Sequence, residues 1–134
     1  MGEHTRDLNA VSRDLALAGE SLPLALSSEQ RPVVQALRRA GTEPWLDTGD
    51  RQSAAADWGP ELGALTTNNT LINQVIQTGA LDEALTEAAQ RLKAVAPGAS
   101  EQELVTELGF IANARVSIDL VRTFGTRVSV ELHP

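Results

Sequence analysis

The sequence contains no cysteine, which excludes disulfide bonds, thiolate catalysis and cysteine-based zinc sites. Histidine is nearly as scarce: the only two, His4 and His133, lie at opposite ends of the chain and cannot form the closely spaced pair of an HExxH metal site. Of the 11 basic residues, Lys93 is the only lysine. The sequence therefore offers a single side-chain amine as a candidate nucleophile.

Aromatic residues and positive charge are also in short supply. Aromatics make up 3% of the chain, and 18 acidic residues against 11 basic ones give a net charge of −7. Such a chain neither neutralises phosphates nor stacks bases, so we expect no nucleic-acid partner. The first residues show no apolar run after a basic start, so we expect no signal peptide, and no run approaches the roughly 20 apolar residues that span a bilayer. We expect a cytoplasmic protein with no membrane partner.

What is present is a regular order of helix and strand patterns. Two helices are predicted first, over 5–18 and 28–41, and in the second we expect a buried stripe of Val33, Val34 and Leu37. Three strands are predicted over 43–47, 63–67 and 127–132, separated by helices over 51–58, 68–79, 80–96 and 100–124. Strands separated by helices indicate an α/β fold with a parallel sheet and crossover helices.

The predicted order divides the chain into two parts. Residues 1–42 form an N-terminal helical extension, and residues 43–134 hold the strands and their crossover helices. The whole length corresponds to about one domain.

Polar side chains end all three predicted strands. They are Asp47, the group Thr66, Thr67 and Asn68, and Glu131. Because the carboxyl ends of parallel strands carry the site in α/β folds, we expect these side chains to converge. Two carboxylates with an amide suit proton transfer. Taken singly, each also fits a simpler interpretation as a turn former, a helix cap or a solvated edge residue.

Three segments at these strand ends resemble the transaldolase family. They read WLDTGD over 45–50, LTTNNTLI over 65–72 and RVSVEL over 127–132. The family patterns are D-[ST]-[AG]-D after the first strand, TTNPSL or TTNPTL after the second and RVS-x-EV in the third. Asn69 stands where the family usually has proline. The resemblance covers about residue 43 to the end.

The resemblance implies a partial (β/α)₈ TIM barrel, with three parallel strands preceded by two helices. It implies transfer of a dihydroxyacetone unit between sugar phosphates through a Schiff base, with no cofactor and no metal, as in the pentose phosphate pathway. Asp47 matches the aspartate of proton transfer, and Glu131 the glutamate that works with a catalytic water. Asn68 matches the substrate-binding asparagine, and Thr66 and Thr67 precede it in the same motif.

The Schiff-base lysine of that family, which lies on the fourth strand, has no counterpart here. Lys93 falls in the predicted helix 80–96, where a solvated cation near a helix end is the expected interpretation. Three strands cannot close a barrel, so we expect another copy or a second chain to supply the missing strands. Leu46, Leu65 and Val130 are expected to face the side that lacks its opposite wall.

Three functions remain open from the sequence. The chain is the N-terminal part of a transaldolase-like enzyme whose lysine comes from elsewhere, or it is a non-catalytic half-barrel that acts as an oligomerising or interaction module. A third hypothesis is a lyase in which Asp47, Asp50 and Glu131 hold a hard cation. It requires that the three carboxylates converge.

Overall fold

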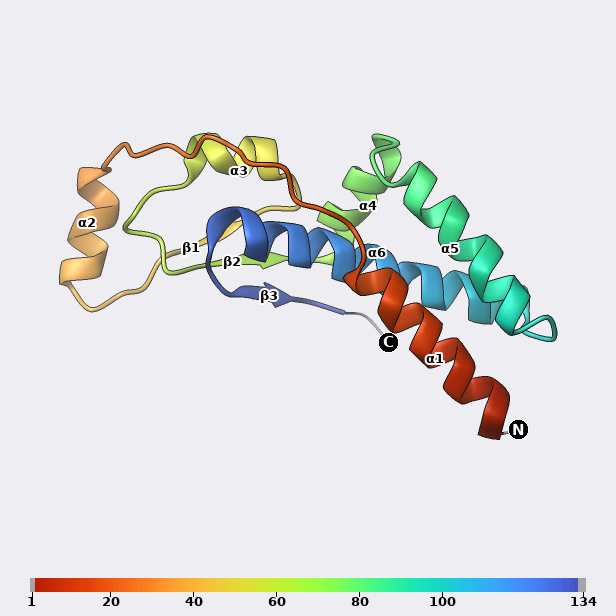
Figure 1. Cartoon of the computed structure of the whole chain (residues 1–134). Coiled ribbons are helices and arrows are strands. Elements are labelled where there is room, and N and C mark those ends of the chain that lie inside the picture. Colours follow the sequence, from red (N-terminus) through yellow and green to blue (C-terminus); the bar gives the residue numbers. More distant parts are fainter. Residues whose placement is uncertain (1, 133–134) are drawn as a thin grey trace.

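The structure, a computed structural model, describes residues 2–132 and shows in them six helices and one three-stranded sheet (Figure 1). His133 lies outside the described residues. The elements, in chain order, are α1 (Gly2–Leu17), α2 (Pro32–Arg39), β1 (Trp45–Asp47), α3 (Arg51–Asp57), β2 (Ala64–Thr67), α4 (Asn69–Gln77), α5 (Asp82–Val95), α6 (Glu101–Phe124) and β3 (Val128–Val130). The predicted α/β fold is confirmed at this level.

The sheet is parallel throughout, as predicted, with the strand order β1-β2-β3. Leu65 of β2 is opposite Leu46 on one side and Val128 on the other. One residue further along, Thr66 is opposite Asp47 and Ser129. Since successive side chains of a strand point to opposite faces, the first row lies on one face of the sheet and the second row on the other.

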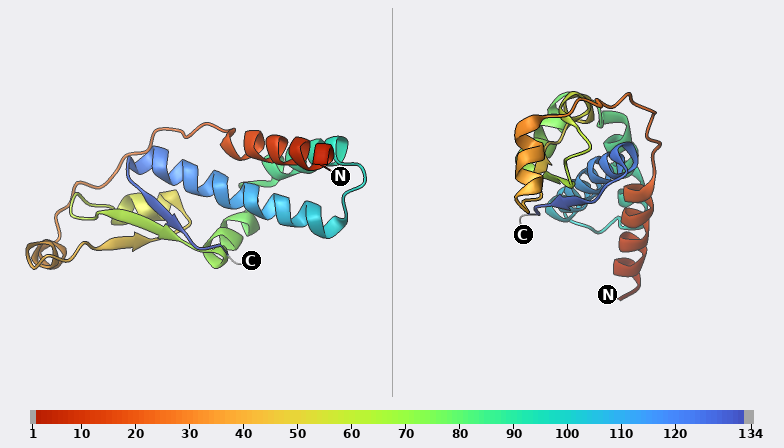
Figure 2. Two further views of the ribbon diagram at one scale, coloured as in Figure 1. Left: turned by 90° about the horizontal axis from the view of Figure 1, so that it is seen from below. Right: turned by 90° about the vertical axis from the view of Figure 1, so that its left-hand side faces the viewer.

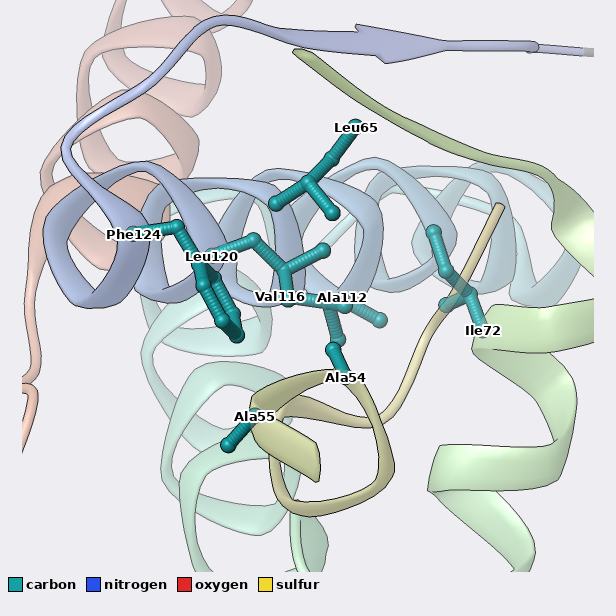
Figure 3. Close-up of a cluster of buried hydrophobic side chains, with 8 residues drawn as sticks. All are labelled: Ala54, Ala55, Leu65, Ile72, Ala112, Val116, Leu120 and Phe124. Atoms are coloured by element: carbon teal, nitrogen blue, oxygen red, sulfur yellow. The ribbon is translucent and has the colours of Figure 1, made fainter. Parts of the chain in front are cut away.

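The helices cover the face that carries Leu65. This side chain is fully buried, and it packs with Ala54 of α3 and with Val116 and Leu120 of α6 (Figure 3). Leu46 and Val128 pack against the same cluster. The prediction that Leu46 and Leu65 face the open side was therefore wrong, because the apolar face of the strands is the face that the crossover helices bury. Val130 lies two residues beyond Val128, so alternation places it on the helix side too.

Apart from the buried Ala64, the opposite face of the sheet carries polar and exposed side chains. Trp45 is 46% exposed, and Asp47, Ser129 and Glu131 are exposed as well. Figure 2 shows α3 and α6 on one side of the sheet. We call the other side the open face.

A second core joins α1 to the rest of the chain. Leu15 of α1 is buried with Ala88 and Leu92 of α5 and with Ile111 of α6. The Ser12 hydroxyl also donates a hydrogen bond of 2.6 Å to Glu107 on α6. The helix nearest the N-terminus therefore packs on the helices that connect β2 to β3.

The second helix differs from its prediction. It begins at Pro32, which supplies the fixed φ of a first helical residue, and none of its residues is buried. Val33 is 74% exposed and Leu37 is 43% exposed, so the predicted buried stripe was wrong. The physical reason is position: α2 stands at one end of the molecule, beyond the sheet, with no neighbouring layer on its apolar side (Figure 1).

Within residues 2–132, none of the helices combines the length and the apolar character that crossing a bilayer requires.

Candidate functional site

The carboxyl end of β1 places Asp47 on the open face, next to Thr66 of β2. The Thr66 hydroxyl donates a hydrogen bond of 2.7 Å to Oδ1 of Asp47. The backbone stays paired with β2 for one residue past β1, because the Thr48 amide donates a hydrogen bond of 2.9 Å to the Thr66 carbonyl. The carboxylate is thus held on a fixed strand end by a side chain of the adjacent strand.

Asn68 and Glu131 follow β2 and β3 on the same face. Asn68 lies two residues after Thr66, and Glu131 lies two residues after Ser129, which is the partner of Thr66. The Glu131 amide still donates to the Thr67 carbonyl at 3.0 Å, so the ladder extends one residue past β3. The Oδ1 atom of Asn68 accepts from the Leu71 amide at 3.0 Å and caps α4. This cap fixes the orientation of the Asn68 side chain.

Asp47, Asn68 and Glu131 line one concavity at this edge of the sheet. Its volume is about 400 Å³. The remaining lining comes from the first turn of α4, namely Asn69, Thr70 and Leu71. The structure thus brings together the two carboxylates and the amide that the sequence singled out. Their roles in catalysis or binding stay predictions.

Thr66 and Thr67 occupy different sides of the sheet. The Thr66 side chain contacts Asp47. Thr67 is only 2% exposed, and its side chain lies on the same face of the sheet as Leu65, two residues earlier on β2. The Thr67 hydroxyl is buried and, among the described residues, has no hydrogen-bond partner. Neither Thr66 nor Thr67 is among the residues that line the concavity.

Two features of the site were missed in the sequence. Ser129 lies in the same row as Asp47 and Thr66 and is exposed on the open face. Counting back two residues from Glu131 along a strand would have found it. Leu71 contributes an apolar wall, and only the position of α4 relative to β1 reveals it.

The loop after β1 uses Asp50 for a structural purpose. Its carboxylate accepts from the amides of Gln52 and Ser53 and from the Ser53 hydroxyl, and so caps α3. The Ser53 hydroxyl, the strongest influence, and then the two amides lower the pKa of Asp50 from its ordinary value, although partial burial opposes them.

A cation site formed by Asp47, Asp50 and Glu131 finds no support. Asp50 is not among the residues that line the concavity. Among residues 7–132, whose side chains the structure describes, no three His, Cys, Asp or Glu side chains gather in a way that could hold a metal ion.

Lys93 lies away from the site. It is exposed in the last turn of α5, as its sequence position indicated, and it is absent from the lining of the concavity. The amine of this chain is therefore not placed to react with a molecule bound beside Asp47.

The arrangement suits proton transfer on a polar ligand. Two exposed carboxylates come from two strands and an amide comes from the strand between them, all at the carboxyl edge of a parallel sheet.

Comparisons of this chain with protein-family models, with curated proteins and with solved structures found no match.

Proposed function

We propose that this chain supplies the first three strands and the acid–base groups of a transaldolase-like enzyme. The observation that carries the proposal is that Asp47, Asn68 and Glu131 line one concavity on the open face. These are the three residues for which the transaldolase resemblance implies proton transfer, substrate binding and activation of water. In a complete (β/α)₈ barrel, the open face would be the inner wall.

In this proposal the reaction moves a dihydroxyacetone unit between sugar phosphates, an activity of cytoplasmic carbohydrate metabolism. A lysine outside these 134 residues condenses with the ketose carbonyl. Asp47, oriented by the Thr66 hydroxyl, accepts a proton from a substrate hydroxyl. This hydroxyl is on the carbon atom whose bond to the dihydroxyacetone unit breaks. Asn68 hydrogen-bonds the substrate, and Glu131 acts through a water molecule. Another copy or a second chain supplies the strands that complete the wall, but the strand with the lysine must come from a different polypeptide, because another copy of this chain would bring only Lys93.

Reductive trapping with borohydride and fructose 6-phosphate tests this proposal. The chain alone is expected to take no label, since Lys93 is not among the residues that line the concavity. Material purified from the native source is expected to carry the label on a strand-borne lysine outside these residues. Replacing Asp47→Asn in that material should reduce turnover by about 100-fold or more, the contribution of a positioned base. Asp14→Asn, an exposed carboxylate on α1, is the matched control. A label on Lys93, or unchanged turnover in Asp47→Asn, would contradict the proposal.

A second candidate function is a non-catalytic half-barrel that joins copies or partners. Its supporting observation is that β1 and β3 each pair on one side only within the described residues. Such strand edges present unpaired amides and carbonyls to another chain. Light scattering on the purified chain distinguishes the candidates: a stable oligomer without affinity for sugar phosphates favours the module, and a monomer contradicts it.

A further inference from the structure

A second and larger hollow lies next to the helices. Its volume is about 670 Å³, within the size range of small-molecule sites. Its walls are the connector after α1, the loop after β1, and helices α4 and α6. It shares Asp47 and Leu71 with the concavity but includes neither Asn68 nor Glu131. We call it the connector cavity.

The floor of the connector cavity is apolar. Val116 and Leu120 of α6 belong to the main core, and Val75 of α4 and Leu81 pack against that core. Apolar side chains at the base of a hollow of this size favour a ligand with a hydrocarbon or aromatic body.

Three guanidinium groups line the wall, and they differ in how their charge is balanced. Arg51 pairs with Asp119 at 3.1 Å. Arg115 and Arg122, seven residues apart on α6 and thus on one side of it, are bound instead to neutral backbone carbonyls. Nε of Arg115 donates to Leu15 at 2.9 Å, and Nη1 of Arg122 donates to Gly19 at 2.7 Å.

The charges of Arg115 and Arg122 lack a carboxylate partner. Among residues 7–132, whose side chains the structure describes, no carboxylate oxygen lies within 4.0 Å of either guanidinium. Four acidic residues also line the cavity, but Asp50 caps α3 and Asp119 pairs with Arg51, which leaves Glu20 and Asp47. Each guanidinium has five donor N–H groups, so both retain donors beyond the one that holds the connector.

We propose that the connector cavity binds an organic anion with an apolar body. Its acidic group lies against Arg115 and Arg122, where charge-assisted hydrogen bonds replace water, and its apolar part rests on Val75 and Leu81, two half-buried apolar residues of the lining. Neither arginine lines the concavity, so the groups that bind the anion differ from those proposed for the sugar phosphate, although the two hollows share Asp47 and Leu71.

The test uses two fluorescent probes of similar shape and different charge. Anilinonaphthalene sulfonate carries an anionic group, and N-phenylnaphthylamine is its neutral analogue. Each is titrated into the folded full-length chain, and a cooperative thermal unfolding transition with intact near-ultraviolet dichroism excludes binding to a loosened core. We expect saturable binding of the sulfonate at one site.

Variants locate the binding and identify the charge. Arg122→Gln, which keeps an amide donor for the Gly19 carbonyl, is expected to lower the affinity for the sulfonate probe about tenfold. The affinity for the neutral probe should not change. Arg122→Lys should restore most of the affinity. Gln74→Trp, on the exposed side of α4 within the cavity wall, should abolish binding of both probes. Arg91→Gln on α5, outside the cavity, is the control.

Two results would overturn the inference. One is the absence of sulfonate binding to the native chain. The other is binding that neither Arg122→Gln nor Gln74→Trp changes, because the probe would then occupy another place.

Discussion

The Thr66 hydroxyl holds the Asp47 carboxylate across two neighbouring strands, with 2.7 Å between the two oxygen atoms. The contact follows from register alone, because β1 and β2 pair Asp47 directly with Thr66. Cross-strand pairs of this kind restrict side-chain rotamers as well as stabilise the sheet. A base that is to accept a proton from a bound hydroxyl benefits from such restriction.

Replacing Thr66→Val tests this contact. Valine keeps the shape and the strand propensity of threonine but removes the donor, so the free energy of unfolding should fall by about 1 kcal/mol or less. Side-chain coupling constants of Asp47 should change from one preferred χ1 rotamer to an average. Ser129→Val, in the same row, should leave the Asp47 rotamer as it is. An unaltered rotamer in Thr66→Val would show that the hydroxyl does not orient the carboxylate.

The core between sheet and helices should respond to truncation far more than α2 does. Leu65→Ala removes a fully buried side chain and is expected to lower the free energy of unfolding by about 3 kcal/mol, measured by urea denaturation. Val33→Ala, on a side chain that is 74% exposed, should change it by about 0.5 kcal/mol or less. Equal losses at the two positions would mean that α2 is packed in solution.

Gly49 allows the loop after β1 to approach α4. A Cβ atom at this position would lie 2.8 Å from the carbonyl oxygen of Leu71. Because this oxygen belongs to the backbone of α4, the contact can be relieved only by shifting the helix or the loop. Gly49→Ala should therefore cost about 1–3 kcal/mol, as overpacking does. Gly98→Ala, where the added atom meets nothing within 4 Å, is the control. Thermal unfolding measures both, and equal midpoints would contradict the close approach.

The cap of α3 makes stability depend on acid pH. The pKa of Asp50 is lower in the folded chain than its ordinary value of 3.8, so its contribution is present above pH 3.8 and is lost as the pH falls through the lowered value. Asp50→Asn retains a good cap but does not titrate. Between pH 5 and pH 2, the stability of this variant should fall less steeply than that of the native chain, by denaturant unfolding at each pH. Parallel curves would assign the acid dependence to other groups.

Glu43 binds Trp45 and Arg127 at the opposite end of the sheet, and a guanidinium nitrogen of Arg38 lies 4.0 Å from its carboxylate. The indole N–H of Trp45 and the guanidinium of Arg127 both donate to the carboxylate and lower its pKa; the indole hydrogen bond is the largest single cause, and Arg127 acts through both a hydrogen bond and its charge. Arg127 also stacks over the Trp45 ring, 5.3 Å from the ring centre. In carbon-detected NMR titrations, the pKa of Glu43 should rise both in Trp45→Phe and in Arg127→Gln, since each variant removes a group that favours the charged carboxylate. An unchanged pKa in either variant would show that the replaced side chain does not act on Glu43.

The periodic and breaker patterns were enough to predict the order of the elements and the convergence of the strand ends. Asp47, Asn68 and Glu131 each follow a strand of a parallel sheet, and that topology brings them to one edge. The face on which each strand residue lies was harder to predict. Apolar residues such as Leu46 and Leu65 fit either the face that the helices cover or the inner face of a barrel. Only the position of α6 shows which face is buried.

The errors at α2 and at Thr67 have one cause. Local spacing shows that a helix has an apolar side or that a strand ends in polar residues, but burial depends on which elements pack there. Val33 and Leu37 have helical spacing and no neighbouring layer. Thr67 follows Thr66 in the motif, yet one step along a strand turns its side chain to the other face.

The attachment of α1 has a consequence for how this chain can be taken apart. Leu15 is buried among α5 and α6 independently of the connector, which continues through Pro23 and Leu26 toward α2. A backbone break in that stretch, whose residues are exposed or half-buried, would leave the contacts of Leu15 with α5 and α6 in place. A synthetic peptide that matches the first helix should then rebind the remainder, so that two separately made parts reassemble into one folded body.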